Sequence, residues 1–321
     1  MIASPESPEI AWRRTGTTAD VAALDAWCAA VGPAIVAKTG AGSAAVTGLE
    51  SLVIVTWNVH VGGGDVGRFV GDLRSGALTG GRPVGDFVLL LQEAFRTGAA
   101  VPASASRKGV PQRIEKRPPS GDRIDVVEAA RQLGLHLFYA PSMRNGLNGA
   151  AEDRGNAILS TPPIASFEAI ELPYEAQRRV AVAGTITGVT RGGAVWTLRL
   201  VSAHLDNRSR WTRLLDSFGP GRTRQAQALA GAVGEPVAVL GGDFNSWSVG
   251  LLENAVPLLR GLFPSSPAET GPTFRAAGLV PRRLDHLLFR LPSGWTASLN
   301  QVDDRYGSDH HPLLSVVQLG S

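Results

Sequence analysis

Near its C-terminus the chain carries the cluster Ser308-Asp309-His310-His311-Pro312, which sets one carboxylate beside two imidazoles. One such cluster is weak evidence, but five further polar clusters lie at the ends of apolar runs elsewhere in the chain. They are Trp57-Asn58, Gln92-Glu93, His204, Gly242-Asp243-Phe244-Asn245 and Leu284-Asp285-His286. Carboxylates, amides and imidazoles can hold a divalent cation and stabilise a phosphoryl group during hydrolysis. The clusters together predict a metal-assisted centre that cleaves phosphate esters.

The candidate metal ligands are oxygen donors. They are the carboxylates of Glu93, Asp243 and Asp309 and the amides of Asn58 and Asn245. Such hard donors suit Mg²⁺, Mn²⁺ or Ca²⁺. Two histidines, His204 and His310, could stabilise or protonate a phosphoryl oxygen. Cys28 is the only cysteine, which excludes both a thiolate metal cluster and an intrachain disulfide.

The polar clusters lie at the ends of expected strands, where side chains sit on a rigid frame but stay open to a substrate. Apolar and β-branched runs predict strands at 52–57, 86–91, 135–140, 156–160, 180–187, 194–203, 236–240, 284–289, 295–302 and 313–319. Apolar residues at helical spacing predict helices at 20–36, 66–73, 125–133, 221–233 and 249–259. Residues 1–18 are expected to be irregular, and residues 98–121 to form a long surface loop or insertion.

Successive strands often lack a helix between them, which argues against a doubly wound parallel sheet. The pattern favours two packed sheets with helices outside. We expect residues 1–49 to form an N-terminal extension with a short helix and a linker. We expect residues 50–321 to form one catalytic domain, because the polar clusters spread along all of it.

Composition sets wider limits on the protein. With 321 residues and 44% hydrophobic content, the chain can bury a sizeable core. Its net charge of +3 permits an anionic partner but does not require one. The N-terminus lacks the features of a signal peptide, and no run of about 18 apolar residues occurs. We therefore expect a cytoplasmic protein without membrane insertion, and a monomer.

Seven motifs in order resemble the series found in the endonuclease/exonuclease/phosphatase superfamily, which includes DNase I. They are Thr56-Trp57-Asn58, Leu91-Gln92-Glu93, Arg154-Gly155-Asn156-Ala157-Ile158-Leu159-Ser160, Ser202-Ala203-His204-Leu205, Gly242-Asp243-Phe244-Asn245, Arg283-Leu284-Asp285-His286 and Ser308-Asp309-His310-His311-Pro312. The resemblance covers about residues 50–319. It implies a DNase I-like four-layered α/β sandwich, in which two packed mixed β-sheets are flanked by helices. It also implies a Mg²⁺-dependent phosphoester hydrolase.

The resemblance implies a role for each matching residue on the metal and water side of the site. Glu93 would be the main Mg²⁺ ligand, assisted by Asn58 and Asp309. Asp243 would orient or deprotonate the attacking water. Asn245 would hydrogen-bond a non-bridging oxygen of the phosphate.

Further roles follow from the resemblance on the phosphate side. His310 would contact the scissile phosphate, while Asp285 fixes its tautomer and raises its pKa. His204 would stabilise the transition state or assist the leaving group. Arg154 and Asn156 would bind substrate, at the rim of the site or as a support of the phosphate position.

The remaining histidines are expected to have no catalytic role. His286 and His311 each follow a candidate residue, so in an extended segment they would point to the opposite face. We interpret both as structural. His60 and His136 lie outside the motifs and are expected to be incidental.

The leading functional hypothesis is a Mg²⁺-dependent phosphodiesterase or nuclease, with nucleic acid as the favoured substrate. An alternative is a phosphomonoesterase or lipid phosphodiesterase, like an inositol phosphatase or a sphingomyelinase, that uses the same site. A further alternative is a non-catalytic phosphate-binding protein. Repair nucleases of the superfamily carry a tyrosine motif that Tyr139 and Tyr174 do not match, which puts abasic-site cleavage in doubt. The choice between endonuclease and exonuclease action, and the number of metal ions, stay open.

Overall fold

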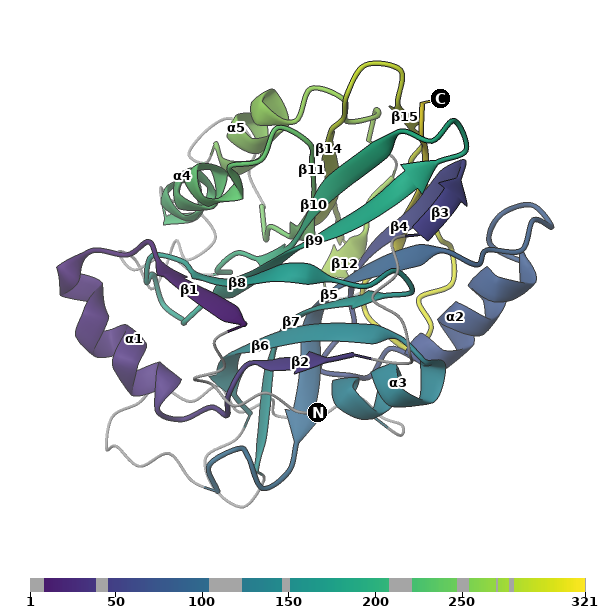
Figure 1. Ribbon diagram of the computed structural model, residues 1–321. Coiled ribbons are helices and arrows are strands. Elements are labelled where there is room, and N and C mark those ends of the chain that lie inside the picture. The colour runs from purple at the N-terminus through teal and green to yellow at the C-terminus, as the bar shows by residue number, and fades with distance from the viewer. Residues whose placement is uncertain are drawn as a thin grey trace.

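The computed structural model describes residues 9–38, 46–103, 123–145, 151–207, 221–246, 254–269, 271–276 and 280–320. In this part of the chain two large mixed β-sheets pack face to face, with helices on their outer sides (Figure 1). Most of the expected loop at 98–121, and residues 249–253 of an expected helix, lie outside the described residues.

The first sheet, called the β10 sheet below, has seven strands in the described residues. In spatial order they are β1 (Ile10–Arg14), β8 (Ala165–Glu171), β9 (Val180–Thr190), β10 (Val195–His204), β11 (Ala238–Asp243) and β14 (Asp285–Arg290), with β3 (Val46–Leu49) beside β9. Strands β10 and β11 are parallel, and β14 runs antiparallel to β11. The carboxyl ends of β10 and β11 therefore meet the start of β14.

The second sheet, called the β4 sheet, has eight strands in the described residues. Their order is β15 (Thr296–Ala297), β17 (Leu313–Gln318), β4 (Ser51–Asn58), β5 (Phe87–Thr97), β7 (Glu152–Ser160), β6 (His136–Arg144) and β2 (Ile35–Ala37), with β16 (Asn300–Gln301) beside β17. Strands β4 and β5 are parallel and lie in the middle. Two short strands, β12 (Phe274–Ala276) and β13 (Val280–Arg282), pair separately.

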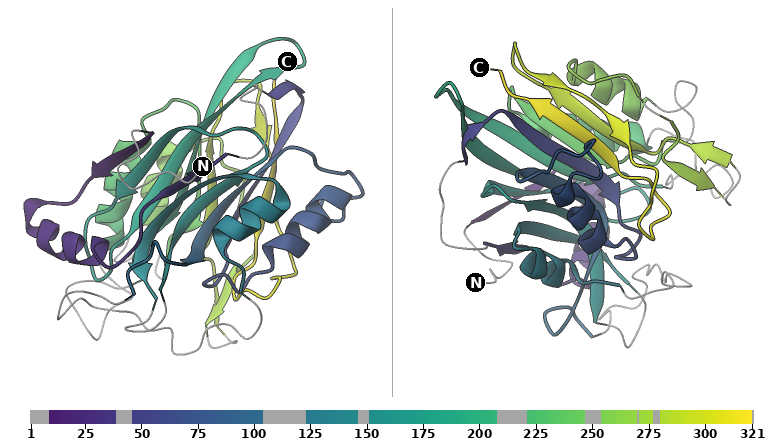
Figure 2. Two further views of the ribbon diagram at one scale, coloured as in Figure 1. Left: turned by 60° about the horizontal axis from the view of Figure 1, so that its bottom comes forward. Right: turned by 90° about the vertical axis from the view of Figure 1, so that its right-hand side faces the viewer.

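Helices complete the four layers of the predicted sandwich (Figures 1 and 2). Helices α2 (Val66–Ser75) and α3 (Val126–Leu133) cover the outer face of the β4 sheet. Helices α4 (Gly221–Val233) and α5 (Ala255–Leu262) cover the outer face of the β10 sheet. The short helices η1 (Thr18–Asp20) and α1 (Val21–Cys28) lie near the N-terminus. No helix in these described layers is long and apolar enough to span a bilayer.

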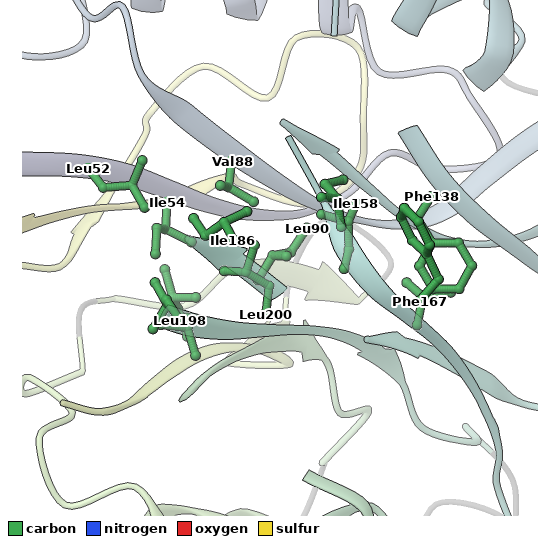
Figure 3. Close-up of a cluster of buried hydrophobic side chains, with 14 of the residues drawn as sticks. Leu52, Ile54, Val88, Leu90, Phe138, Ile158, Phe167, Ile186, Leu198 and Leu200 are labelled. Atoms are coloured by element: carbon green, nitrogen blue, oxygen red, sulfur yellow. The ribbon is translucent and has the colours of Figure 1, made fainter. Parts of the chain in front are cut away.

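The central strands are largely apolar because both of their faces are buried. Along β4, Leu52 and Ile54 point into the space between the sheets, while Val55 and Trp57 point toward α2. Figure 3 shows Leu52 and Ile54 facing the other sheet, where Leu198 lies. This two-sided burial explains why the sequence shows continuous apolar runs rather than alternation in these strands.

Truncating the core residue Leu198 to alanine is expected to lower the free energy of unfolding by about 2–5 kcal/mol. Leu198 is fully buried between the sheets, so its loss leaves a cavity. Val195, on the same strand, is 73% exposed. Val195→Ala should therefore change stability by less than about 0.5 kcal/mol. Urea unfolding of both variants tests the placement of Leu198 in the core. Equal losses of unfolding free energy in the two variants would contradict it.

The N-terminal region differs most from the sequence-based expectation. The helix expected over residues 20–36 ends at Cys28, because Gly32 and Pro33 interrupt the helical pattern. Residues 35–37 instead form β2, which pairs with β6. Strands β1 and β3 were not expected, and they pair with β8 and β9. A separate extension over residues 1–49 stays a prediction, and its described part contributes strands to both sheets.

Candidate active site

The register of the β10 sheet aligns three candidate residues from distant parts of the chain. His204 on β10 is paired with Asp243 on β11, and Asp243 is paired with Asp285 on β14. All three side chains are buried. Neighbouring register positions on paired strands bring side chains within about 4.5–5.5 Å of each other. The sheet itself thus assembles this half of the site.

The β4 sheet supplies the other half at the same end of the sandwich. The amide nitrogen of Asn58, the last residue of β4, donates to Asp243 Oδ2 at 3.0 Å. The amide oxygen of Asn58 accepts from the backbone nitrogen of His60 at 3.0 Å. The Asp243 carboxylate can only accept and the His60 backbone nitrogen can only donate, so together they fix the orientation of the Asn58 amide. Gln92 is buried behind it and donates to Ser202 Oγ at 3.0 Å, which links the two sheets.

Glu93 lies in a β-bulge of strand β5. The pairing of β5 with β7 shifts register between Leu91 and Ala94, and Glu93 has a φ of 53°. A left-handed backbone is uncommon for a residue other than glycine, and such strain gathers at functional sites. The bulge re-aims the side chain, so that Glu93 Oε2 lies 3.5 Å from Arg154 Nη1.

His310 is held rigidly beside Asp285. Its Nδ1 lies 2.7 Å from Asp285 Oδ2, and its ring packs on Phe274 with centroids 4.8 Å apart. Nε2 faces the carboxylates of Asp243 and Asp309, at 3.9 Å from each. Burial lowers the pKa of His310, but Asp285 and these two carboxylates outweigh burial and raise it to about 10. The surrounding carboxylates therefore favour the protonated, cationic form of His310.

Asp243 lies at the centre of the cluster. Burial raises its pKa, and the nearby Asp285 adds to this effect. The charge of His310 and the hydrogen bonds from Asn58 and the Asn245 backbone oppose the rise without cancelling it. A carboxylate whose pKa is raised toward neutrality is a better general base than an ordinary aspartate.

Asn245 connects Asp243 to His204. Its backbone nitrogen donates to Asp243 Oδ1 at 2.9 Å. Its amide nitrogen donates to the Leu205 carbonyl at 3.1 Å and lies 2.9 Å from His204 Nε2. The carbonyl fixes this nitrogen as a donor, so His204 Nε2 must be an acceptor and His204 is neutral in this arrangement. His204 Nε2 also lies 3.4 Å from Asp243 Oδ2.

The two candidate substrate-binding residues lie in a recess next to this cluster. Arg154 and Asn156 line it together with Glu93, Ser142, Met143, Gly155, Arg179 and His204. Both candidates are buried, and the amide nitrogen of Asn156 donates to the Val180 carbonyl at 2.6 Å. Both side chains thus lie inside the protein, and their assignment to substrate binding stays a prediction.

The three expected metal ligands can be tested against their surroundings. Asn58, Glu93 and Asp309 offer only oxygen donors, which fit a hard cation. The Oδ1 atom of Asp309 is buried and accepts no hydrogen bond in the described part of the chain. A cation would satisfy such an atom. In the same part, Asp243, Asp285 and His310 form a group whose ligand atoms lie within 4.8 Å of one another. The donors present thus fit a divalent ion, and the ligand assignment stays a prediction.

Sequence reasoning missed residues that touch the site. His60, expected to be incidental, has its Nδ1 3.8 Å from Asp309 Oδ1. Its only signal in the sequence is its position two residues after Asn58. The hydroxyl oxygen of Thr273 accepts hydrogen bonds from the backbone nitrogens of Leu284 and Asp285, at 3.1 Å each. These bonds position Asp285. Neither Thr273 nor Phe274 stood in a recognised motif.

The two histidines interpreted as structural make packing contacts. His286 stacks on Phe244 with ring centroids 5.2 Å apart, and its Nδ1 lies 3.0 Å from Glu269 Oε1. His311 Nδ1 lies 3.0 Å from the Val302 carbonyl. These partners hold both rings in the surrounding structure.

The chain is similar to known proteins in sequence and in fold. Residues 55–310 match the family model described as "Endonuclease/Exonuclease/phosphatase family". An endonuclease/exonuclease/phosphatase crystal structure from Beutenbergia cavernae has a TM-score of 0.55 and 19% identity, covering 85% of this chain and 72% of that one. This likeness shows the shared fold.

Two other solved structures are less similar. The inositol polyphosphate 5-phosphatase domain of SPsynaptojanin, in complex with inositol (1,4)-bisphosphate and calcium ion, has a TM-score of 0.45 at 13% identity, covering 84% of this chain and 83% of that one. The APE2 catalytic domain of Xenopus laevis has a TM-score of 0.46 at 12% sequence identity, covering 84% of this chain and 92% of that one. Among curated proteins, no sequence matches this chain significantly.

Proposed function

Because the chain belongs to the endonuclease/exonuclease/phosphatase family, whose members hydrolyse phosphoesters, we propose that it is a divalent-metal-dependent phosphodiesterase that acts on nucleic acid. One observation carries the proposal. Asp243 is buried where Asn58, His204 and His310 converge on it, with Asp285 behind His310. A base and a cationic donor then face the same small space, as hydrolysis of a phosphate ester requires.

In the proposed reaction a water oxygen attacks phosphorus and Asp243 accepts the proton that this water loses. The bond from phosphorus to the leaving alcohol oxygen breaks, and that oxygen takes up a proton from solvent water, while Asp243 later returns its proton to solvent. His310 donates from Nε2 to a non-bridging oxygen, and its positive charge stabilises the charge that develops there. Asp285 holds the His310 ring in the orientation that this contact needs.

Asn58, Glu93 and Asp309 would hold the metal ion, which when bound neutralises negative charge on the phosphate. Asn245 has both amide hydrogens engaged, by Leu205 and His204. To bind a phosphate oxygen it would exchange its contact with His204. The role expected for Asn245 thus implies that the His204 contact changes when substrate binds.

A substrate panel tests the proposal. The purified protein would be assayed with Mg²⁺, with Mn²⁺ and with a chelator. The substrates would be plasmid DNA, single-stranded DNA, RNA, bis-p-nitrophenyl phosphate, inositol phosphates and sphingomyelin. We expect metal-dependent cleavage of nucleic acid and of the model diester. Turnover of inositol phosphates or sphingomyelin alone would replace the nuclease assignment with the phosphomonoesterase or lipid alternative. No turnover by folded protein would overturn the proposal.

Replacing Glu93 with glutamine is expected to weaken Mg²⁺ binding at least about tenfold, because the change removes the charged ligand. Glutamine keeps the size of the side chain. Isothermal titration calorimetry measures the effect. Glu50→Gln, an equal change of charge just before the opposite end of β4, is the matched control and should bind as the wild type does. Equal Mg²⁺ affinity in the Glu93→Gln variant would contradict the ligand assignment.

A further inference from the structure

The turn that follows β4 places His60 against the proposed metal ligands. His60 Nδ1 lies 3.8 Å from Asp309 Oδ1. That oxygen is buried without a hydrogen-bond partner in the described residues, and the His60 side chain beside it is 32% exposed. An imidazole nitrogen therefore faces a buried carboxylate oxygen that has no hydrogen-bond partner in the described residues. The separation exceeds the hydrogen-bond range of about 2.7–3.2 Å.

The backbone of this turn is strained. His60 has a φ of 48° and Val61 has a φ of 55°. For a β-branched residue such as Val61, a left-handed conformation is a genuine outlier. It is held by hydrogen bonds from Val59 to the Gln92 carbonyl at 2.9 Å and from Gly63 to the His60 carbonyl at 3.0 Å. Strain of this kind persists where surrounding contacts over-determine the backbone, and it often serves a site.

The same turn ties His60 to Asn58, another proposed ligand, because the His60 backbone nitrogen donates to the Asn58 amide oxygen. Two atoms that share one ion at about 2.1 Å each lie no more than about 4.2 Å apart. The spacing between His60 Nδ1 and Asp309 Oδ1 falls within this limit. His310 Nε2 lies 3.9 Å from the same oxygen, but the proposed reaction uses it for the phosphate.

We propose that His60 is a nitrogen ligand of the metal centre, beside Asn58 and Asp309. This inference rests on the proposed function only in assuming that a divalent ion binds there. Imidazole suits borderline cations, whereas Mg²⁺ prefers oxygen donors. His60 therefore shifts the selectivity of the centre toward ions such as Co²⁺.

The test compares Co²⁺ and Mg²⁺ binding in the full chain. His60→Asn removes the imidazole, and asparagine tolerates a left-handed backbone, so the turn is preserved. We expect calorimetry to show Co²⁺ affinity falling about tenfold or more while Mg²⁺ affinity changes less than about threefold. The visible absorption spectrum of bound Co²⁺ should also change, which reports the loss of a nitrogen ligand without reference to activity.

His136→Asn is the control for binding of Co²⁺ to other histidines. His136 starts β6 opposite Ser160, at the far end of the sandwich, and this variant should bind as the wild type does. Equal Co²⁺ affinity and an unchanged spectrum in His60→Asn would overturn the inference and leave the proposed function intact. A wild type that binds neither ion would overturn both. An equal loss of Co²⁺ and Mg²⁺ affinity in His60→Asn would also overturn the inference, because a nitrogen ligand must discriminate between the two ions.

Discussion

Replacement of Asp243 by asparagine is expected to lower the kcat for phosphodiester hydrolysis about 10²- to 10⁴-fold. Asparagine cannot accept a proton from water. It also presents an amide that cannot satisfy both the Asn58 amide and the Asn245 backbone nitrogen as the carboxylate does. Steady-state kinetics with saturating Mg²⁺ measures the loss, and circular dichroism confirms that the variant is folded.

The control for this variant is Asp25→Asn, the same substitution at an exposed residue that pairs with Arg14. It should retain wild-type kcat. If Asp243→Asn kept kcat within about threefold of the wild type, Asp243 could not be the general base, since proton transfer by a positioned group contributes about 10²-fold or more.

Replacement of His310 by glutamine is expected to cut kcat about 10²- to 10³-fold and leave Mg²⁺ affinity nearly unchanged. Glutamine can keep a hydrogen bond to Asp285, but it carries no positive charge. His310 owes that charge to the carboxylates around it, which raise its pKa. Kinetics and calorimetry on the same preparation separate the two effects.

The adjacent histidine provides the matched control for this second variant. His311 lies against the Val302 carbonyl and Arg305, away from the carboxylate cluster. His311→Gln should therefore keep most of the activity. A His310→Gln variant that lost Mg²⁺ binding in step with turnover would make His310 a metal ligand and contradict the role assigned to it.

Much of the fold could be predicted because its signals are local. The helix over residues 221–233 has the bounds that its periodicity indicated. The apolar runs before Asn58 and Asp243 are strands because both of their faces are buried. Strands β1, β2 and β3 could not be predicted, since they are short and depend on distant partners. A segment of three to five residues is too short to show the hydrophobic pattern of a strand.

The candidate site could likewise be predicted only in part from the sequence. The residue types at strand ends pointed to the chemistry, and the order of motifs pointed to the family. The sequence could not show that Asp243 pairs with Asp285 across β11 and β14, because register depends on the whole sheet. Nor could it show that a bulge turns Glu93 toward Arg154. His60 was assigned no role, because only the strained turn brings it to Asp309.

The central claim is that water attacks phosphorus at the Asp243–His310 site, and isotope incorporation tests it most directly. Bis-p-nitrophenyl phosphate would be hydrolysed in ¹⁸O-labelled water with Mg²⁺, by the wild type and by Asp243→Asn. We predict one ¹⁸O atom in the p-nitrophenyl phosphate, none in the p-nitrophenol, and at least about a 10²-fold slower reaction in the variant. Label in the p-nitrophenol, or equal rates for the two proteins, would contradict the account.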